Sequence, residues 1–320
     1  MRIVFMGSPQ FAVPSLEALH HSSHEVVAVV TQPDRPKGRK LQMQPPRLKI
    51  AAHRLNIPVL QPATTKSEIF YEEVRLFQPD LLVVVAYGEI LRANLLALPT
   101  RGAVNLHGSL LPKYRGAAPI AWAILEGESV TGATTMMMNE VMDGGPILLQ
   151  EECAIAAIDT AETLAIRISQ SGAHLLKKTV DMLARNEIVA RAQDLDRVSY
   201  APKLRKEDGR IDWNQSALRI SRQIRAFNPW PGSFSDFRGM TVKFWLAHPD
   251  GGSISELPGT VVQVNRQSLL VACGEQSVLE ILEVQPQNRP RFPAADFIHG
   301  YSIRTGDRFE SADESGNISK

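Results

Sequence analysis

The sequence has few cysteines, almost no net charge and no long apolar run. Its 320 residues include two cysteines, Cys153 and Cys273, which are far apart and form no CxxC pair. This argues against a structural disulfide or a zinc site and favours a reducing compartment. No stretch approaches the roughly 18 apolar residues of a membrane-spanning helix, and MRIVFMGSPQF at the N-terminus lacks the features of a signal peptide. We therefore expect a cytoplasmic protein with no membrane partner.

The charges nearly cancel, with 35 Lys and Arg against 34 Asp and Glu, which gives a formal net charge of +1. Any affinity for nucleic acid must therefore come from a local patch. The hydrophobic share of 44% is ordinary for a soluble globular protein. The length predicts two domains, because single cores stop growing near about 250 to 300 residues.

The first half of the chain alternates short apolar runs with amphipathic segments. We expect strands at residues 3–6, 26–31, 58–60, 81–86, 103–106 and 133–138. LLVVVA, residues 81–86, is apolar throughout, as a strand covered on both faces must be. The alternation predicts right-handed βαβ units and an α/β fold with a Rossmann-like doubly wound parallel sheet. Ligands of such sheets bind beyond the carboxyl ends of the strands.

The second half has a different pattern. A long amphipathic helix is expected to begin near Asp159, and a polar stretch without periodicity follows it. Short β-rich runs (VKFWLA, GTVVQV, SLLVAC, VLEILEV) then come at close intervals, which is typical of a small barrel. We predict a catalytic domain over residues 1–187, a linker over 188–206, a β-barrel domain over 207–304 and a disordered tail over 305–320.

Two stretches give only weak signals for a cofactor or a metal. MGSPQF follows the first predicted strand but lacks the glycines of a GxGxxG loop, which argues against a nicotinamide-dependent oxidoreductase. HHSSH places His20 and His24 four residues apart, but no carboxylate or cysteine is spaced to complete a metal site. We therefore predict no metal.

Polar side chains at one predicted strand end are more informative. Asn105 and His107 are two residues apart, so their side chains point to the same face, and Gly108 allows a close approach by a ligand. Asp143 in NEVMDGG follows the next predicted strand. If both strands belong to one parallel sheet, the three residues converge at one edge.

An Asn, a His and an Asp together suit acyl transfer. The amide donates to a developing oxyanion, the imidazole handles a proton, and the carboxylate orients the imidazole. No Ser or Cys stands beside them as a covalent nucleophile, which favours direct attack by a substrate amine. The alternative is that Asn105, His107 and Asp143 only satisfy buried main-chain groups at the strand ends.

The run NLHGSLLPKYRGAAP, followed by MDGG, resembles the signature of 10-formyltetrahydrofolate-dependent formyltransferases. MRIVFMGSPQFAVPSLEAL, TQPDRPKGRKL, VVAYGEIL and RAFNPWPGSF fit the members of this family that act on methionyl-tRNA. The similarity extends from residue 1 to about residue 304. It implies that the barrel is OB-like and binds tRNA. The implied reaction transfers the formyl group of 10-formyltetrahydrofolate to the α-amine of methionyl initiator tRNA, for translation initiation in a bacterial or organelle-type system.

The resemblance also assigns residues. It gives catalysis to Asn105, His107 and Asp143. It places folate contacts on Ser109, Leu110, Leu111 and Pro112, with Ala86, Tyr87 and Gly88 as another wall of the folate site. Lys113, Tyr114 and Arg115 receive no role. We expect the protein to act as a monomer.

A basic segment follows the second predicted strand. Residues 31–54 hold seven cations against one acid, Asp34, and several prolines exclude a helix from its first part. Neutralising phosphates is the simplest use of such a loop. The family resemblance implies that the loop enters the tRNA acceptor stem, with contacts from Arg35, Lys37, Arg39 and Lys40. The barrel half holds weaker candidates, because acids accompany them: Arg205, Lys206, Arg219, Arg222 and Arg225.

Three other functions compete with this one. A sugar-nucleotide formyltransferase shares the signature but would lack the basic GRK segment. The hydrolase module of formyltetrahydrofolate dehydrogenase would belong to a far longer chain. A non-catalytic RNA-binding protein would have no use for Asn105, His107 and Asp143 together.

Overall fold

The computed structural model describes residues 1–37 and 42–311. The chain divides into two compact units. The first comprises residues 1–119, 129–155 and 164–202, and the second comprises residues 120–128, 156–163 and the chain from Lys203 onward. The boundary after residue 202 lies inside the predicted linker.

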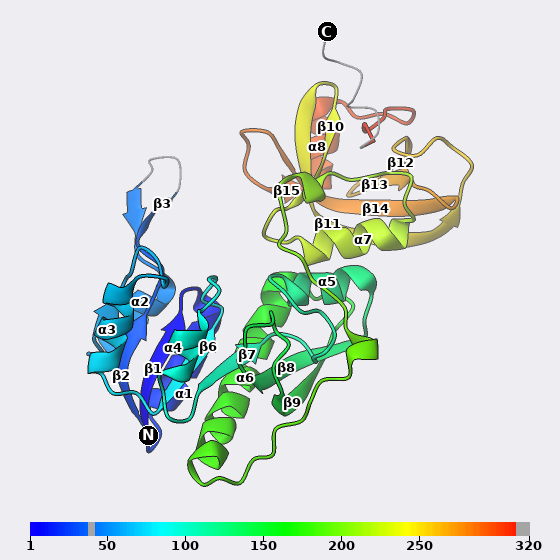
Figure 1. The fold of residues 1–320 in the computed structure, drawn as a ribbon. Helices are drawn as coiled ribbons and strands as arrows, with labels where there is room; N and C mark the ends of the chain where they lie inside the picture. Colours follow the sequence, from blue (N-terminus) through cyan, green and yellow to red (C-terminus); the bar gives the residue numbers. More distant parts are fainter. Residues whose placement is uncertain (38–41, 312–320) are drawn as a thin grey trace. The chain divides into compact units, whose positions relative to one another are not determined.

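A seven-stranded sheet forms the centre of the first unit (Figure 1). Its strand order is β5-β2-β1-β6-β7-β8-β9, and the bounds are Arg2–Gly7 for β1, Glu25–Val30 for β2, Val59–Leu60 for β5, Leu81–Val85 for β6, Ala103–His107 for β7, Val130–Met137 for β8 and Ile147–Ala154 for β9. All six predicted strands are confirmed. The sheet is parallel from β5 to β7, but β8 and β9 are antiparallel.

The prediction of an entirely parallel sheet is therefore wrong at this edge. Residues 138–146 join β8 directly to β9 without a crossover helix, so the two strands form an antiparallel pair. β9 was not predicted, because the strand lies at the edge of the sheet. Its second half, Gln150–Ala154, is mostly exposed and is not apolar.

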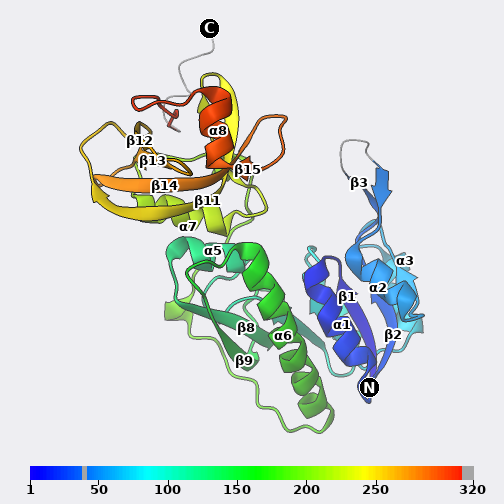
Figure 2. The same ribbon diagram turned by 180° about the vertical axis from the view of Figure 1, so that it is seen from behind.

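Helices cover both faces of this sheet, which confirms the doubly wound fold. On one face, α3 (Glu68–Leu76) and α4 (Ala93–Ala97) pack against Val4, Met6 and Leu82. On the opposite face, seen in Figure 2, lie α1 (Val13–His20) and the long α6 (Ala161–Ala184). Helix α2 (Arg47–Arg54) contacts α1. Gly172 lets α6 pack closely on the sheet, because a Cβ there would lie 3.1 Å from Leu106.

The second unit is built on an antiparallel sheet in the order β10-β11-β14-β13-β12, as the predicted barrel requires. The bounds are Ser233–Phe237 for β10, Met240–Ser253 for β11, Val261–Val264 for β12, Leu269–Ala272 for β13, Ser277–Pro286 for β14 and Phe292–Pro293 for β15, which pairs with β14. The unit also contains α5 (Pro119–Glu126), α7 (Ala217–Ala226) and α8 (Ala294–Tyr301).

Residues 307–311 are held against the second unit by main-chain hydrogen bonds and by Phe309 in its core, so the predicted disorder of residues 305–320 is wrong for its first part. Phe309 is fully buried, with its ring centroid 5.0 Å from that of Phe237 and 5.6 Å from that of Trp213. Main-chain bridges join Glu310 to Asp236 at one edge of the sheet and Arg308 to Thr260 at the other. The segment thereby closes the sheet into a small barrel. Residues 312–320 lie outside the described residues.

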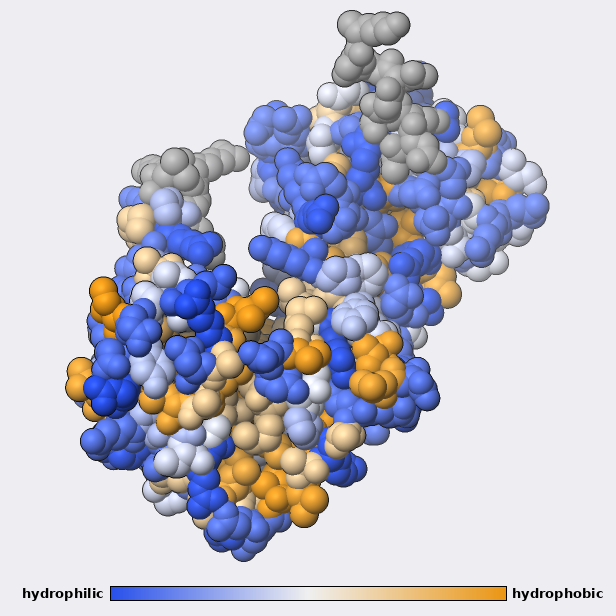
Figure 3. Space-filling model, viewed as in Figure 1, coloured by the Kyte–Doolittle hydropathy of each residue, from blue (hydrophilic) through white to orange (hydrophobic). Residues whose placement is uncertain are grey.

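Apolar side chains are exposed at separate points of the first unit, as at Ile69 and Ile90. In the view of Figure 3, hydrophilic side chains cover most of the second unit. Within residues 1–37 and 42–311, no helix combines the length and hydrophobicity that a membrane span needs.

Candidate active site

Strand β7 presents Asn105 and His107 on one side. It lies between β6 and β8, with Asn105 opposite Val84 and Met136. His107 ends the strand and is only 7% exposed. The Oδ1 atom of Asn105 is buried and accepts no hydrogen bond from any described residue. Such an orphan acceptor costs about 1–3 kcal/mol, so an unsatisfied amide oxygen at this position indicates a site that a ligand completes.

The ring of His107 is oriented by a main-chain carbonyl. Its Nε2 atom lies 2.9 Å from the carbonyl oxygen of Tyr114, which can only accept, so Nε2 carries the hydrogen. Tyr114 has a left-handed backbone (φ 60°), which turns its carbonyl toward the ring. Nδ1 is left as the atom that exchanges a proton, and it faces the Asp143 carboxylate at 3.7 Å. Asp143 was predicted to orient the ring, but the Tyr114 carbonyl makes the hydrogen bond that fixes the neutral tautomer.

Asp143 reaches His107 for a different reason from the one predicted. Because β8 is antiparallel to β7, the end of β8 at Met137 lies beside Val104, at the start of β7. Residues 138–146 must therefore turn back along β7. Gly145 permits the turn, since a Cβ there would lie 1.7 Å from the Met137 carbonyl oxygen.

Among the described residues, the carboxylate of Asp143 accepts a hydrogen bond from the main chain of Gly116. The N–H of Gly116 donates to its Oδ2 over 2.8 Å, and this oxygen is the one nearest His107. Asp143 itself has a left-handed backbone (φ 49°). His107 and Asp143 thus lie together, with Asn105 two residues before His107 on β7, and main-chain groups of Tyr114 and Gly116 contact the pair. Neither contact had a sequence signal, because both are main-chain groups.

The SLLP turn divides into two kinds of residue. Ser109 is fully buried; its hydroxyl donates to the Lys113 carbonyl and its own carbonyl accepts from Thr134. Leu111 packs in a small cluster with Met136 and Ile147. Leu110 and Pro112 remain partly exposed. Only these last two side chains are open to a ligand, and the first two build the turn.

The segment after β6 presents main chain rather than side chains. Ala86 and Gly88 are exposed and both have a left-handed backbone, with φ of 49° and 89°. Tyr87 is 2% exposed, and burial, together with the nearby Glu89 carboxylate, raises the pKa of its hydroxyl. Burial alone would raise the pKa of Glu89, but hydrogen bonds from Gln32 and Thr65 outweigh it and lower that pKa.

The basic segment contains a two-stranded hairpin of β3 (Arg35–Lys37) and β4 (Gln42–Gln44). Arg35 is exposed, whereas Arg39 and Lys40 lie outside the described residues. Two cations of the segment are engaged elsewhere. Lys49 pairs with Asp34 at 2.9 Å and Arg54 pairs with Glu17. Hydrogen bonds from Gln61 and Lys49 lower the pKa of Asp34.

Two of the three arginines of α7, Arg219 and Arg225, have structural partners within the second unit. Arg219 donates to the Leu125 carbonyl and pairs with Glu126. Arg225 donates to the Asp159 carbonyl over 2.9 Å. Both guanidinium groups are thereby held against main-chain oxygens, which supports the weaker rank that the sequence analysis gave them as phosphate contacts.

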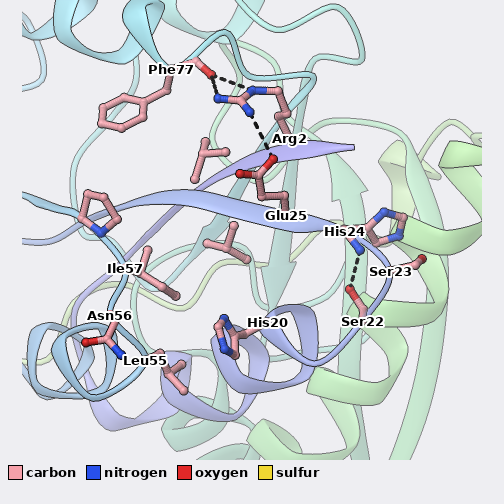
Figure 4. A pocket seen from close by; sticks show the side chains of 13 residues that line it. Arg2, His20, Ser22, Ser23, His24, Glu25, Leu55, Asn56, Ile57 and Phe77 are labelled. Carbon is pink, nitrogen blue, oxygen red and sulfur yellow. Dashed lines mark hydrogen bonds and ion pairs between the residues drawn. The ribbon is translucent and has the colours of Figure 1, made fainter.

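A surface pocket of about 610 Å³ lies at the other edge of the sheet, at the amino ends of β1 and β2. Figure 4 shows the Arg2 guanidinium in this pocket, donating to the Phe77 carbonyl and the Glu25 carboxylate. Asn105 and His107 stand at the carboxyl end of β7, so this pocket is not part of the candidate active site. The described part of the chain has no group of three His, Cys, Asp or Glu side chains placed to hold a metal.

Two family models match the chain. The one described as "Formyl transferase" matches residues 1–180, and the one described as "Formyl transferase, C-terminal domain" matches residues 203–302. The chain belongs to the formyl transferase family. The second match begins at Lys203, where the last segment of the second unit also begins.

Several relatives that match this formyl transferase over nearly its full length are named methionyl-tRNA formyltransferase. A methionyl-tRNA formyltransferase of Citrifermentans bemidjiense is 45% identical over 99% of both chains. Another, of Koribacter versatilis, is 45% identical over 100% of both. Among solved structures, an N-formyltransferase of Helicobacter canadensis, in complex with folinic acid and dTDP-3-aminofucose, has a TM-score of 0.64 at 18% identity and covers 87% of this chain and 98% of its own. This last likeness shows the fold.

Proposed function

We propose that this formyl transferase moves the formyl group of 10-formyltetrahydrofolate to the α-amine of methionyl initiator tRNA. One observation carries the proposal. Asn105, whose buried amide oxygen has no partner among the described residues, lies on the same side of β7 as His107, and His107 faces Asp143 at 3.7 Å. The relatives named for this reaction match essentially the whole chain, both units included.

The chemistry follows from the atoms that face the site. The folate supplies an activated formyl carbon, and the amine of the methionyl group attacks it directly. The Asn105 amide donates to the carbonyl oxygen as it becomes an oxyanion, and protonated His107 adds a second positive contact. Asp143 stabilises the imidazolium across 3.7 Å. The C–N bond to N10 then breaks as Nδ1 of protonated His107 gives its proton to N10 and takes up the proton that the amine loses, or as water carries the proton between the two nitrogens.

The residues near Asn105 fit a folate. The exposed main chain at Ala86 and Gly88 offers hydrogen-bonding groups for the polar edge of a pterin ring. Leu110 and Pro112 offer partly exposed apolar surface for its faces. We propose that these four residues make the direct contacts, while Ser109, Leu111 and Tyr87 support the walls from inside the fold.

The hairpin of β3 and β4 supports a tRNA partner. Arg35 is exposed at the base of the hairpin, whereas Arg39 and Lys40 lie outside the described residues. Its base is anchored through the ion pair of Asp34 with Lys49. We propose that Arg35, Lys37, Arg39 and Lys40 contact phosphates of the acceptor stem.

The test is incubation of the purified protein with 10-formyltetrahydrofolate and charged initiator tRNA, followed by mass spectrometry of the amino acid released from the tRNA. We expect formyl-methionine. Elongator methionyl-tRNA and a dTDP-amino sugar serve as parallel acceptors. Formylation of the amino sugar without formylation of the tRNA would overturn the assignment of the acceptor, and transfer to neither would overturn the reaction.

A further inference from the structure

Residues 185–202, which follow α6, contact two parts of the candidate active site: the loop that carries Asp143 and residues 114–116. Arg191 exchanges two main-chain hydrogen bonds with Ile147, at the end of the loop that carries Asp143. Further on, the N–H of Arg115 donates to the Ser199 carbonyl over 2.8 Å, and Ala201 donates to the Arg115 carbonyl over 2.7 Å. The segment therefore contacts the Asp143 loop and the residues that flank Tyr114 and Gly116.

Gln193 is the side chain of this segment that contacts both parts. Its Nε2 donates to the carbonyl of Asp143 over 2.8 Å and to that of Gly145 over 2.7 Å. Its Oε1 accepts from Nη2 of Arg115 over 2.7 Å and from Nε over 3.1 Å. Gln193 is 9% exposed and Arg115 is 4% exposed. Buried hydrogen bonds of this kind are costly to leave unmade, so the amide holds the loop firmly.

Only an amide satisfies this arrangement. The guanidinium of Arg115 can only donate hydrogen bonds, and the carbonyls of Asp143 and Gly145 can only accept them. One end of the side chain at position 193 must therefore accept, and the other end must donate twice. A carboxylate would keep the contact with Arg115 but would place an oxygen against the carbonyls of Asp143 and Gly145. A thioether would lose both contacts.

The contacts of Asp143 show why this matters. Its backbone is left-handed (φ 49°), a conformation that costs a non-glycine residue energy and persists only where the surroundings impose it. Gly116 holds the carboxylate and Gln193 holds the main chain. Arg115 and Gly116 are neighbours in the sequence. Gly116 binds the carboxylate of Asp143 directly, and Arg115 binds Gln193, which holds the main chain of Asp143.

We propose that Gln193 is a positioning residue that sets the Asp143 carboxylate against Nδ1 of His107. The inference rests on the proposed function for its kinetic consequence, but its structural content does not depend on it. Gln193 touches the main chain of Asp143 and not its carboxylate, so its effect on the reaction passes through Asp143.

The kinetic test is a double-mutant cycle. Gln193→Glu removes both N–H donors and keeps the acceptor for Arg115, and Gln193→Met is a neutral second variant. Gln223→Glu is the matched control, because Gln223 also donates to two main-chain carbonyls, of Asp208 and Arg210, both over 3.2 Å, within the second unit. Thermal melts show which variants fold.

We expect each Gln193 variant to lower kcat by roughly 10- to 100-fold, with the KM for the folate changed by less than about threefold. In an Asp143→Ala background the same substitutions should change kcat by less than about threefold, because the group that Gln193 positions is gone. Gln223→Glu should leave kcat at saturating tRNA unchanged in both backgrounds. An equal loss in both backgrounds, or no loss in either, would overturn the proposal.

A second readout separates this proposal from the proposed function. The imidazole ¹⁵N signals of His107, identified by their absence from His107→Gln, report the environment of Nδ1. They should move in Gln193→Glu and Gln193→Met and stay in place in Gln223→Glu. If the wild-type protein transferred no formyl group but the signals moved as expected, the function would be wrong and the positioning role would stand. Unmoved signals in folded Gln193 variants would contradict the positioning role.

Discussion

Replacing Asp143 with asparagine tests the role of its charge with little change of shape. The amide of the new side chain would keep an oxygen to accept from the Gly116 N–H, which now donates to Oδ2 over 2.8 Å. Only the negative charge beside His107 would be lost. The substitution therefore separates electrostatic stabilisation of the imidazolium from the packing of the loop.

The size of the effect follows from the distance. Two unit charges 3.7 Å apart attract by roughly 4.5 kcal/mol at an effective dielectric constant of about 20. The side chains are 7% and 17% exposed, so solvent screens the pair only in part. Since about 1.4 kcal/mol is a factor of ten in rate, the full attraction corresponds to about three orders of magnitude. We expect kcat to fall by roughly 10²- to 10³-fold.

The assay is single-turnover formation of formyl-methionine with both substrates saturating, so that differences in binding do not enter the rate. The thermal midpoint of Asp143→Asn should lie within a few degrees of that of the wild type, which would show that the loop remains folded. A folded Asp143→Asn protein with less than a tenfold loss would refute the electrostatic role of Asp143.

Four other outcomes follow from the structure. Asn105→Ala should lower kcat by about 10²- to 10³-fold, as loss of an oxyanion donor does, and kinetics check this. The free energy of unfolding should stay unchanged or rise, because the substitution removes a buried acceptor that has no partner among the described residues, and urea unfolding checks this. Phe309→Ala should cost about 3–5 kcal/mol by urea unfolding, because it empties the centre of the second unit, and a loss below about 1 kcal/mol would contradict the assigned core. Arg35→Ala should raise the KM for tRNA, leave that for folate unchanged and reduce the salt slope of tRNA binding by about one; an unchanged slope would place Arg35 off the phosphates. The folded-state pKa of Asp34 is lowered, so its contribution to stability is present above the ordinary Asp range and is lost as pH falls through the folded pKa. In acid, the thermal midpoint of Asp34→Asn should therefore fall less steeply with pH than that of the wild type. Equally steep profiles of the two proteins would exclude this contribution.

Periodicity predicted the strands that bury both faces. β6 is apolar throughout and its bounds were predicted to within a residue. β9 could not be predicted in this way, because it lies at an edge and most of its second half is exposed. The C-terminal segment was misjudged for a similar reason. Phe309 is a single phenylalanine among polar residues, which gives no periodic pattern. It is buried against the rings of Trp213 and Phe237, which are far away in the sequence.

The candidate site was predicted as a set of residues but not as a geometry. Asn105 and His107 share a side of β7 because of the two-residue repeat of a strand, which is local. The approach of Asp143 depends on an antiparallel β8 and a loop that turns back at Gly145, which no local pattern shows. Gln193 and the Tyr114 carbonyl were invisible, because their contacts involve main-chain atoms brought near by tertiary structure.

The most direct test of the account is the amino acid recovered from initiator methionyl-tRNA after reaction with 10-formyltetrahydrofolate, with wild-type and His107→Ala proteins compared at equal concentration. The account predicts formyl-methionine from the wild type and a rate at least about 10²-fold lower from folded His107→Ala. Formyl-methionine formed at equal rates by both proteins would contradict the assigned active site, and its absence with the wild type would contradict the function.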